Sequence, residues 1–427
     1  MRRASLCRAL PALAVGVLLA ILAAPGAASA SEVLVYRDGK VTTATDPLLP
    51  PPAAQELSPT PAAGPEPEAR AAQTGTVKQV LAENLAAGLI TQADFDYYNA
   101  IWDEGVATRD RLGGRCAKQL GKVLSHADRI ANGGQLSPSR MPATFLTIRR
   151  NTQFWASRPN VAPGQRVAFP PAQMVFQHYA GQGIQIQPLG NFGKANGLWG
   201  ECVGRFGAKK QRKCKAEELR QLLDELVAVR AERAGFAAWE YYFDFLRGRP
   251  PWISGMAQAT AVQALARGAQ FLGEPAYMEP ASSALGAFEQ SSPIGVLVRS
   301  AGGNHYLLYS FARGYRVLNG FLQAVIGLHD YAQISGDPRA QSLFAAGDRA
   351  ARREVPRYDT GKWSYYALPT RDLAPYGYQQ LVTTFLQRMC RLTGAKVYCR
   401  HAARFSRYLR KPQTKPGAGA PRKRCGY

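Results

Sequence analysis

The sequence predicts an all-α fold, an incomplete (α/α) barrel or toroid of helical hairpins with a few short strands. Hydrophobic residues make up 46% of the 427 residues, which is enough for a sizeable core. Apolar residues recur at helical spacing in one segment after another, and the connections between these segments are irregular. Helical hairpins can stack around a central axis, which would gather short loops and helix starts around one open end as a groove.

Residues 1–30 have the pattern of a secretory signal peptide. Basic residues come first, an apolar run covers residues 9–24, and Ala28-Ser29-Ala30 is a small-residue cleavage site. An uncleaved membrane anchor is the alternative, but the apolar run is short for a bilayer span. The sequence therefore predicts a protein of the cell envelope or the exterior, with membrane contact only through an uncleaved signal.

Residues 31–75 are rich in Pro, Ala and Glu and predict an extended linker. A small helical subdomain is expected at 76–160. Its first helix begins near Thr76, Thr91 caps the second, and a third runs over about 105–131. The stretch 132–168 is turn-rich and predicts a long connection.

The main domain is expected at 161–410. Near its start, Ile and Gln alternate over 184–187, which suits a short extended piece with Gln185 and Gln187 on one face. Buried amides need partners, so these two side chains should meet each other, the backbone or a sugar. A loop without a ligand is the alternative. Residues 294–298 predict a short strand, and residues 411–427 form a basic tail. Helices are expected at 216–233, 256–272, 278–288, 318–334, 338–355 and 378–392.

The charge balance predicts a polyanionic partner. Loss of the signal would remove Arg2, Arg3 and Arg8 from the 53 Lys and Arg residues and no acid, so the formal net charge would fall from +23 to +20. Basic exported proteins meet acidic polysaccharide, teichoic acid, lipid headgroups or nucleic acid. Export and the lack of a nucleic-acid motif argue against nucleic acid. A charge that only keeps the protein soluble is the alternative.

Six cysteines remain after the signal, and an even number in an exported chain predicts disulfides. Cys202 with Cys214 and Cys390 with Cys399 are the nearest neighbours, which leaves Cys116 with the tail residue Cys425. Six cysteines allow fifteen pairings. A zinc site is less favoured, because no CxxC pair occurs and the five histidines are scattered.

Tyrosines crowd the region around Val317-Leu318-Asn319-Gly320-Phe321. Their hydroxyls can donate protons while their rings close a groove. This density predicts a polar-lined cleft, with an ordinary aromatic core as the alternative. The tyrosines are Tyr306, Tyr309, Tyr315, Tyr358, Tyr365, Tyr366, Tyr376 and Tyr378.

Over roughly residues 170–395 the chain resembles the carboxy-terminal domain of the D-glucuronyl C5-epimerases, which act on heparosan and heparan sulfate. The resemblance rests on six segments that follow the order of the family. It implies an incomplete (α/α) barrel, in agreement with the helical hairpins. The β-rich domain that precedes it in the animal enzymes has no obvious counterpart here. The six segments are 183–187, 251–258, 306–309, 317–321, 326–331 and 358–361.

The resemblance implies a carbohydrate epimerase that needs no metal or organic cofactor. A base removes the C5 proton of a glucuronate, and an acid returns a proton from the other face to give iduronate. A basic, water-poor groove would stabilise the charge of the intermediate. The implied substrate is an acidic polysaccharide.

Tyrosine and glutamate transfer the protons in this family. By resemblance, Tyr309 matches the tyrosine of a Glu-Glu-Tyr-Pro segment, Tyr366 a tyrosine after the Tyr-Asp-Thr-Gly motif, and Tyr376 a tyrosine that opens the next helix. Asn319 and Gln258 lie in matching motifs as sugar contacts. From charge alone, Arg371 and Arg313 are candidates to meet the substrate carboxylate.

One departure from the family bears on catalysis. Leu307 and Leu308 stand where the family has two glutamates, and Gly377 and Gln379 stand near the place of a family histidine. Candidate replacements are Glu240, Asp244, His305 and Asp372. Carboxylates on helix surfaces are common, however, and a lone histidine is more often structural. His305 is the most interesting candidate because it lies three residues from Leu308, and we also count it among the substrate-binding residues.

These observations favour an exported uronate C5-epimerase. A polyuronate lyase would begin with the same proton removal and then eliminate the C4 substituent. A non-catalytic relative that binds acidic glycan is the other alternative, which the lost glutamates favour. A purely structural helical protein is the least favoured.

Overall fold

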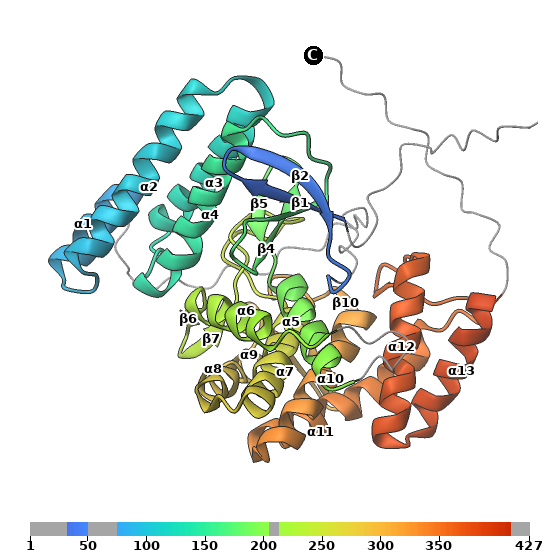
Figure 1. The fold of residues 1–427 in the computed structure, drawn as a ribbon. Coiled ribbons are helices and arrows are strands. Elements are labelled where there is room, and N and C mark those ends of the chain that lie inside the picture. The colour runs from blue at the N-terminus through green and yellow to red at the C-terminus, as the bar shows by residue number, and fades with distance from the viewer. Residues whose placement is uncertain (1–31, 50–74, 205–212, 411–427) are drawn as a thin grey trace, which may run out of the picture.

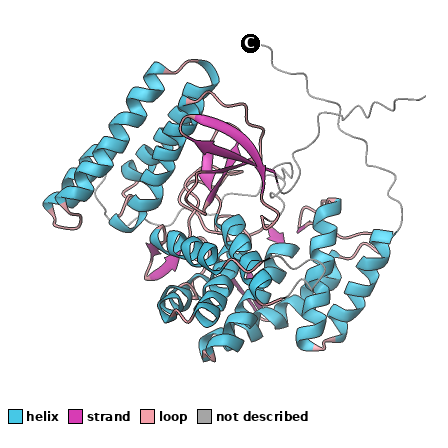
Figure 2. Cartoon of the chain, viewed as in Figure 1, coloured by secondary structure: helices cyan, strands magenta, loops and turns pink. Residues whose placement is uncertain are grey.

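The computed structural model describes residues 32–49, 75–204 and 213–410. The predicted signal peptide (1–30) and basic tail (411–427) lie outside the described residues, as does most of the predicted linker. Helices dominate the described chain, and the strands are short (Figure 2).

Four helices form the N-terminal part of the structure: α1 (Val77–Ala86), α2 (Gln92–Arg111), α3 (Gly114–Asn132) and α4 (Met141–Ala156). Thr76 and Thr91 cap α1 and α2, each in a capping box, which confirms the cap predicted at Thr91 and the helix start expected near Thr76. The single helix expected at 105–131 is wrong, because the chain leaves α2 after Arg111 and starts again at Gly114, whose φ is +57°.

The long connection expected at 132–168 is also wrong, because it contains η1 (Pro138–Arg140) and α4. The β-branched residues of α4 hide its helical character in the sequence. In the structure, the hydroxyls of Thr144 and Thr147 donate to the carbonyls of Arg140 and Ala143, at 2.9 and 2.8 Å. Burial of the apolar face then outweighs the weak local preference.

A five-stranded sheet combines two strands that precede these helices with three that follow them, in the order β2-β1-β3-β4-β5. Only the pairing of β1 with β3 is parallel. The sheet lies beside α3 and α4 (Figure 1). Its strands are β1 (Glu32–Arg37), β2 (Lys40–Thr45), β3 (Arg166–Ala168), β4 (Val175–Tyr179) and β5 (Gly183–Ile186).

One part of this sheet was predicted from the sequence and another was not. Residues 32–45, assigned to the linker, form the β1–β2 hairpin, which corrects that assignment. Its turn is Asp38-Gly39, and both residues have positive φ, as a tight hairpin turn requires. The extended piece expected at 184–187 is confirmed as β5.

The rest of the described chain is an incomplete (α/α) barrel, which confirms the predicted fold class. The inner helices are α5 (Pro188–Cys202), α7 (Gly255–Leu272), α10 (Leu318–Ser335) and α12 (Tyr376–Thr393). Each packs on the next, whereas α12 does not return to pack comparably on α5 within the described chain. An outer helix follows each inner one. The outer helices are α6 (Ala216–Ala228), α8 (Met278–Ser283), α11 (Pro338–Glu354) and α13 (Lys396–Arg410).

Short elements connect these helices. The helix expected at 278–288 is divided into α8 and α9 (Gly286–Glu289), and the strand expected at 294–298 begins later, as β8. The remaining elements are β6 (Ala231–Arg233), β7 (Phe236–Ala238), η2 (Pro275–Tyr277), β8 (Leu297–Ser300), β9 (Gly303–Tyr306), β10 (Arg316–Val317), η3 (Val355–Tyr358) and β11 (Ala367–Leu368).

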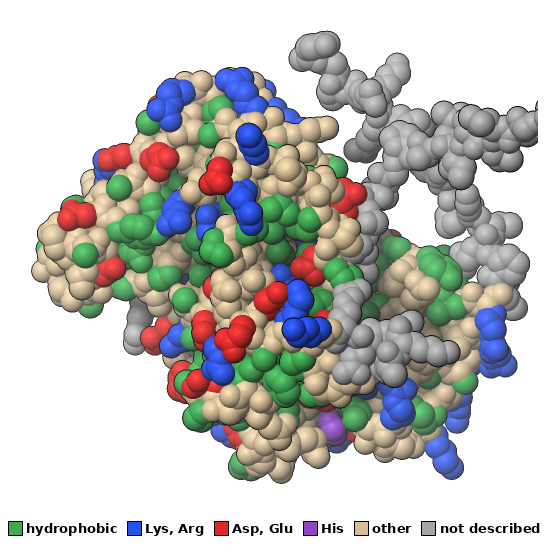
Figure 3. All heavy atoms as spheres, in the orientation of Figure 1, with side chains coloured by type: hydrophobic (Ala, Val, Ile, Leu, Met, Phe, Trp, Pro, Cys, Tyr) green, Lys and Arg blue, Asp and Glu red, His purple; other side chains and the backbone are tan. Residues whose placement is uncertain are grey.

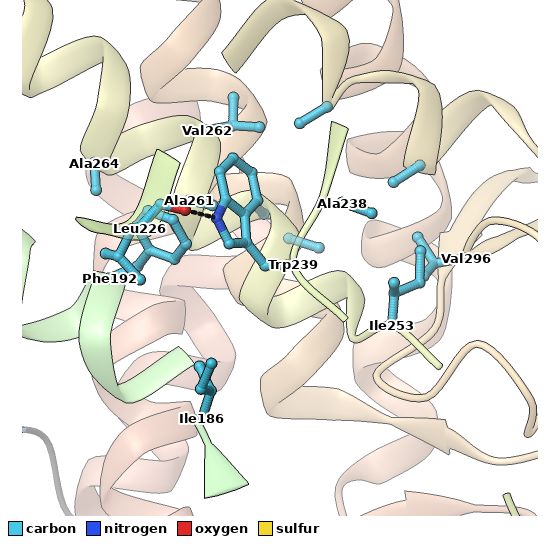
Figure 4. Packing of buried hydrophobic residues seen from close by; sticks show 14 of the residues in the cluster. Ile186, Phe192, Leu226, Ala238, Trp239, Ile253, Ala261, Val262, Ala264 and Val296 are labelled. Atoms are coloured by element: carbon cyan, nitrogen blue, oxygen red, sulfur yellow. Dashed lines mark hydrogen bonds between the residues drawn. The ribbon is translucent and has the colours of Figure 1, made fainter. Parts of the chain in front are cut away.

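Close packing holds the inner helices in place. Gly327 of α10 faces α7 so tightly that a Cβ there would lie 2.4 Å from the carbonyl oxygen of Ala259. The indole of Trp239 lies in the core and donates a hydrogen bond to the Leu226 carbonyl at 2.7 Å (Figure 4). The aromatic segment after β7 is thereby anchored to α6.

Two predicted disulfides are confirmed. Cys202 bonds Cys214, and Cys390 bonds Cys399, which joins α12 to α13. Cys116 has no disulfide partner among the described residues. Its predicted partner, Cys425, lies outside them.

Candidate functional site

The inner helices of the barrel all begin around one cavity of about 660 Å³. Residues from the starts of α5, α7, α10 and α12 line it, together with the aromatic segment 241–252 and residues 308–309. The β-sheet closes one side through Arg166 of β3 and Tyr179 of β4. The groove expected at the open end of a helical toroid is therefore present, with the sheet as an additional wall.

Tyr309 and Tyr366 both line this cavity, and their hydroxyls are hydrogen-bonded. The interaction lowers the pKa of Tyr309 and raises that of Tyr366. Burial is the largest cause in both cases and holds both pKa values above the usual range. Both phenols are therefore protonated at neutral pH.

Backbone contacts explain how these two tyrosines meet. The Gly255 amide at the start of α7 donates to the Leu307 carbonyl at 3.1 Å, and the Ser310 amide donates to the Ile253 carbonyl at 2.9 Å. This fixes Tyr309 beside α7. The Leu318 amide, at the start of α10, donates to the Tyr366 carbonyl at 3.2 Å.

Tyr376, the third predicted catalytic tyrosine, is 51% exposed, and its ring stacks near that of Trp363. It is not among the residues that line the cavity, although its neighbours Pro375 and Gly377 are. Two residues further along α12, Tyr378 does line the cavity, with its ring centre 5.1 Å from that of Tyr366.

The predicted amide ligands divide into two groups. Gln187 and Asn319 line the cavity, and the buried Oδ1 of Asn319 has no hydrogen-bond partner. Gln187 caps α5 by accepting from the Gly190 amide, and it also hydrogen-bonds the hydroxyl of Tyr179. Gln185 lies outside the cavity lining and donates to the Gln182 carbonyl.

Gln258 is a structural residue. Its side chain is fully buried, accepts from the Trp239 amide at 2.9 Å and donates to the Ala237 carbonyl at 3.2 Å. It does not line the cavity. These bonds explain its place in the motif, because they fix the chain before the aromatic segment against α7.

His305 is also remote from the cavity lining. Its Nδ1 lies 2.9 Å from Oε2 of Glu354, which also pairs with Arg316 at 2.8 Å. Burial lowers the pKa of His305 despite this partner. The contacts connect β9 to α11, which is a structural role. Arg371 is exposed, has a φ of +60° and does not line the cavity, and neither does Arg313.

The candidate carboxylates are engaged elsewhere. Glu240 lies fully buried between Arg140 and Arg233, each 2.7 Å away. Burial alone would raise the pKa of Glu240, but the two guanidinium groups lower it to about 2. Asp244 pairs with Lys122 at 3.0 Å and with Arg129, so it bridges to α3.

Asp372 does not line the cavity either, and its buried Oδ2 has no hydrogen-bond partner. Its backbone carbonyl accepts from the Tyr366 amide at 2.7 Å and thereby helps to place that tyrosine. The negative charge of Asp372 also adds to burial in raising the pKa of the nearby Tyr315.

The Tyr358-to-Gly361 motif is structural. The hydroxyl of Tyr358 donates to the Arg316 carbonyl at 2.9 Å. Oδ1 of Asp359 accepts from the Gly361 amide and from the hydroxyl of Tyr408 on α13, each at 2.8 Å. The motif thus joins the chain before Tyr366 to β10 and to the outer helix.

Arg166, like Tyr179, is a site residue that the sequence did not predict. It is only 3% exposed, lines the cavity, and is the one charged residue among the described residues that do so. Its only signal in the sequence is an arginine at the start of the short apolar segment Arg166-Val167-Ala168. Leu308 also lines the cavity, whereas Leu307 is fully buried. The cavity therefore offers phenols, amides and one cation.

The described residues contain no group of three or more His, Cys, Asp or Glu placed to hold a metal ion. None of the helices within the described ranges is long and apolar enough to cross a membrane. On the surface, basic side chains gather over α12 and α13 (Figure 3). On α13 the exposed ones are Lys396, Arg400, Arg407 and Arg410.

Comparisons with known proteins find similarities to the second half of the chain. Residues 233–407 match the family described as D-glucuronyl C5-epimerase C-terminus. The chain is 34% identical over 132 residues to the D-glucuronyl C5-epimerase of Caenorhabditis elegans, which covers 28% of this chain and 21% of that protein. It is 27% identical over 149 residues to an uncharacterized protein of Methanocaldococcus jannaschii, covering 33% of this chain and 48% of the relative.

The chain thus spans about a fifth and about half of the lengths of these two relatives. Among solved structures, a sugar epimerase from a ruminal bacterium matches with a TM-score of 0.41 and 10% identity, over 67% of this chain and 72% of that one. A D-mannose isomerase matches with a TM-score of 0.37 and 10% identity, over 51% of this chain and 58% of that one. Residues 233–407 are thus similar to the C-terminal domain of the D-glucuronyl C5-epimerase family.

Proposed function

We propose that this protein is an exported uronate C5-epimerase that converts glucuronate to iduronate within an acidic polysaccharide. The observation that carries the proposal is the hydrogen-bonded pair of Tyr309 and Tyr366 in the cavity of a domain similar to that of the C5-epimerase family. Two phenols within hydrogen-bond reach can pass a proton between substrate and protein, as general acid–base catalysis requires.

Epimerisation needs a proton-transfer group on each face of the sugar ring. The Tyr309–Tyr366 pair comes from segments next to α10, whereas Tyr179 comes from β4 of the sheet, and all three line the cavity. We assign the pair to one face and Tyr179 to the other. Tyr309 is the better base of the pair, because the hydrogen bond from Tyr366 stabilises its oxyanion. Tyr376 remains a proposed third participant at the edge of the cavity.

The remaining features support a polymeric, anionic substrate outside the cytosol. The formal net charge of +23 and the exposed basic residues of α13 suit a polyanion. Two disulfides suit an oxidising compartment. Asn319, with its unpartnered Oδ1, is proposed as a sugar contact through a donated hydroxyl bond.

Proton exchange at C5 tests the proposal. The protein is incubated with heparosan and other polyuronates in deuterium oxide, and deuterium at C5 is measured by NMR. Incorporation that Tyr309→Phe or Tyr366→Phe abolishes would support the epimerase. New unsaturated chain ends would indicate a lyase instead.

A second candidate function is glycan binding without catalysis. The apolar Leu308 favours it, because it lines the cavity where the family motif has a glutamate. In the same experiment, salt-sensitive binding of a polyuronate without any deuterium incorporation would support this alternative.

A further inference from the structure

Arg166 is a cation enclosed by protein without the partners that such a group normally has. It is 3% exposed, and neither its Nε nor its Nη1 has a hydrogen-bond partner. Burial lowers the pKa of Arg166 to about 10, which leaves it charged at neutral pH. A buried guanidinium without a partner costs stability, and most such groups are paired or coordinate a ligand.

The start of α5 adds positive potential next to Arg166. A Cβ placed on Gly190, in the first turn of α5, would lie 3.5 Å from Nη2 of Arg166, so the guanidinium lies against the start of that helix. A helix N-terminus carries partial positive charge. The nearby Asp46 is already paired with Lys194 at 3.0 Å.

The neighbouring strand β4 also carries buried polar atoms that have no hydrogen-bond partner. Arg166 of β3 is in register with Gln177 of β4, and cross-strand partners project from the same face of a sheet. Gln177 is fully buried, and neither its Nε2 nor its Oε1 has a hydrogen-bond partner. Gln177 does not line the cavity, so of this cross-strand pair only Arg166 can meet a ligand there, through oxygen acceptors.

We propose that Arg166 binds the carboxylate of the uronate ring. This assignment rests on the proposed function and deepens it, because it names the group that distinguishes a uronic acid from a neutral hexose. The planar guanidinium offers two adjacent N–H donors, which suit the two oxygens of a carboxylate. The binding residue comes from the β-sheet, outside residues 233–407 that match the family domain.

The position of Tyr179 agrees with this assignment. Burial raises the pKa of Tyr179 above its usual range, and the hydrogen bond with Gln187 and the charge of Arg166 oppose this shift. C5 of a uronate is bonded directly to the carboxyl carbon. A carboxylate held by Arg166 would therefore bring C5 next to the phenol that we assign to one face of the ring.

Binding measurements can isolate the contribution of Arg166. Heparosan oligosaccharides are titrated calorimetrically against wild-type protein, Arg166→Met and Arg166→Lys, in parallel with the same oligosaccharides after reduction of their carboxyl groups to alcohols. Wild type should prefer the carboxylated form by roughly 10- to 100-fold, the range of a hydrogen-bonded charge pair. Arg166→Met should bind both forms alike. Arg166→Lys should show an intermediate preference for the carboxylated form, because lysine keeps the positive charge but lacks the two adjacent N–H donors of the guanidinium group.

Arg150→Met is the matched control. Arg150 lies on α4, donates to Gln153 at 3.0 Å, covers the ring of Phe169 and does not line the cavity. The Arg150→Met protein should keep the wild-type preference for the carboxylated oligosaccharides. Thermal melting supplies a second readout: Arg166→Met should melt at or above the temperature of wild type, because an unpaired buried charge is removed.

The outcomes separate this inference from the proposed function. An Arg166→Met protein that retains the carboxylate preference, or that melts well below wild type, would show a structural arginine and overturn the inference, whatever the C5 exchange result. A preference that disappears in Arg166→Met, in a wild-type protein that shows no C5 exchange, would uphold the carboxylate site and reject the epimerase.

Discussion

Tyr309 and Tyr366 are side-chain hydrogen-bond partners inside a cavity whose only charged lining residue in the described chain is Arg166. The family motif places a glutamate next to Tyr309, whereas here Leu308 occupies that position. If the protein is an epimerase, tyrosine side chains must therefore carry out its proton transfers.

Removal of the Tyr366 hydroxyl should abolish catalysis without unfolding the protein. We expect Tyr366→Phe to reduce C5 deuterium exchange by at least about 100-fold, the lower range for loss of an acid–base group. Tyr306→Phe is the matched control. Its buried hydroxyl donates to the Leu343 carbonyl at 2.7 Å, away from the cavity, so it should cost about 1 kcal/mol of stability and leave the chemistry unchanged. Equal exchange rates in the two variants would contradict the assigned role of Tyr366.

The exchange rate should rise with pH. Burial holds the pKa of Tyr309 above its usual range, so at neutral pH only a small fraction of the phenol is ionised. This fraction, and with it kcat/KM, should increase about tenfold for each pH unit below that pKa. The pKa of Arg166, about 10, limits the range in which the proposed carboxylate site stays charged. A profile that levels off near neutral pH would instead indicate a carboxylate or histidine base.

Loss of the Glu240 charge should destabilise the protein. Glu240→Gln leaves Arg140 and Arg233 buried without a counter-ion, which should cost about 3 kcal/mol. Chemical denaturation at neutral pH measures this cost. Because the folded-state pKa of Glu240 is lowered to about 2, its stabilising effect is present above the usual glutamate pKa and is lost as pH falls through about 2. The difference between wild type and Glu240→Gln should therefore shrink on acidification.

Packing between α7 and α10 should not tolerate an added methyl group. A Cβ on Gly327 would lie 2.4 Å from the Ala259 carbonyl oxygen, and backbone atoms cannot move away cheaply. Gly327→Ala should cost about 2 kcal/mol. Gly314→Ala is the control, since a Cβ there meets nothing within 4 Å. Similar melting temperatures for the two variants would contradict the close approach of these helices.

Local patterns in the sequence predicted much of the helical architecture. α10 and α11 lie within about a residue of their expected ranges, because apolar periodicity and the Gly336-Asp337-Pro338 break are local signals. The disulfides Cys202–Cys214 and Cys390–Cys399 join neighbours in the sequence and were predicted for that reason. Residues 31–75 predict a linker because of their Pro-rich composition, which obscures the hairpin signal Asp38-Gly39 at the turn between β1 and β2.

The site could be predicted only in part. Motif resemblance led to Tyr309, Tyr366, Gln187 and Asn319, all of which line the cavity. The same reasoning led to Gln258, which is equally characteristic of its motif but holds the backbone of the aromatic segment. A motif residue that binds ligand and one that supports the fold look alike in a single sequence, because both are polar and both lie at a helix start.

The sequence by itself determined the helical hairpins, the local disulfides, the strongly basic charge and the similarity of residues 233–407 to the D-glucuronyl C5-epimerase family. The tertiary structure alone decided which polar groups face the cavity and which of them are already satisfied. Arg166 reaches the same cavity as Tyr309 from a strand far away in the chain, and its unpartnered nitrogens become apparent only after burial has removed water. Periodicity and spacing describe neighbours along the chain, whereas a binding site depends on desolvation and on contacts between distant segments.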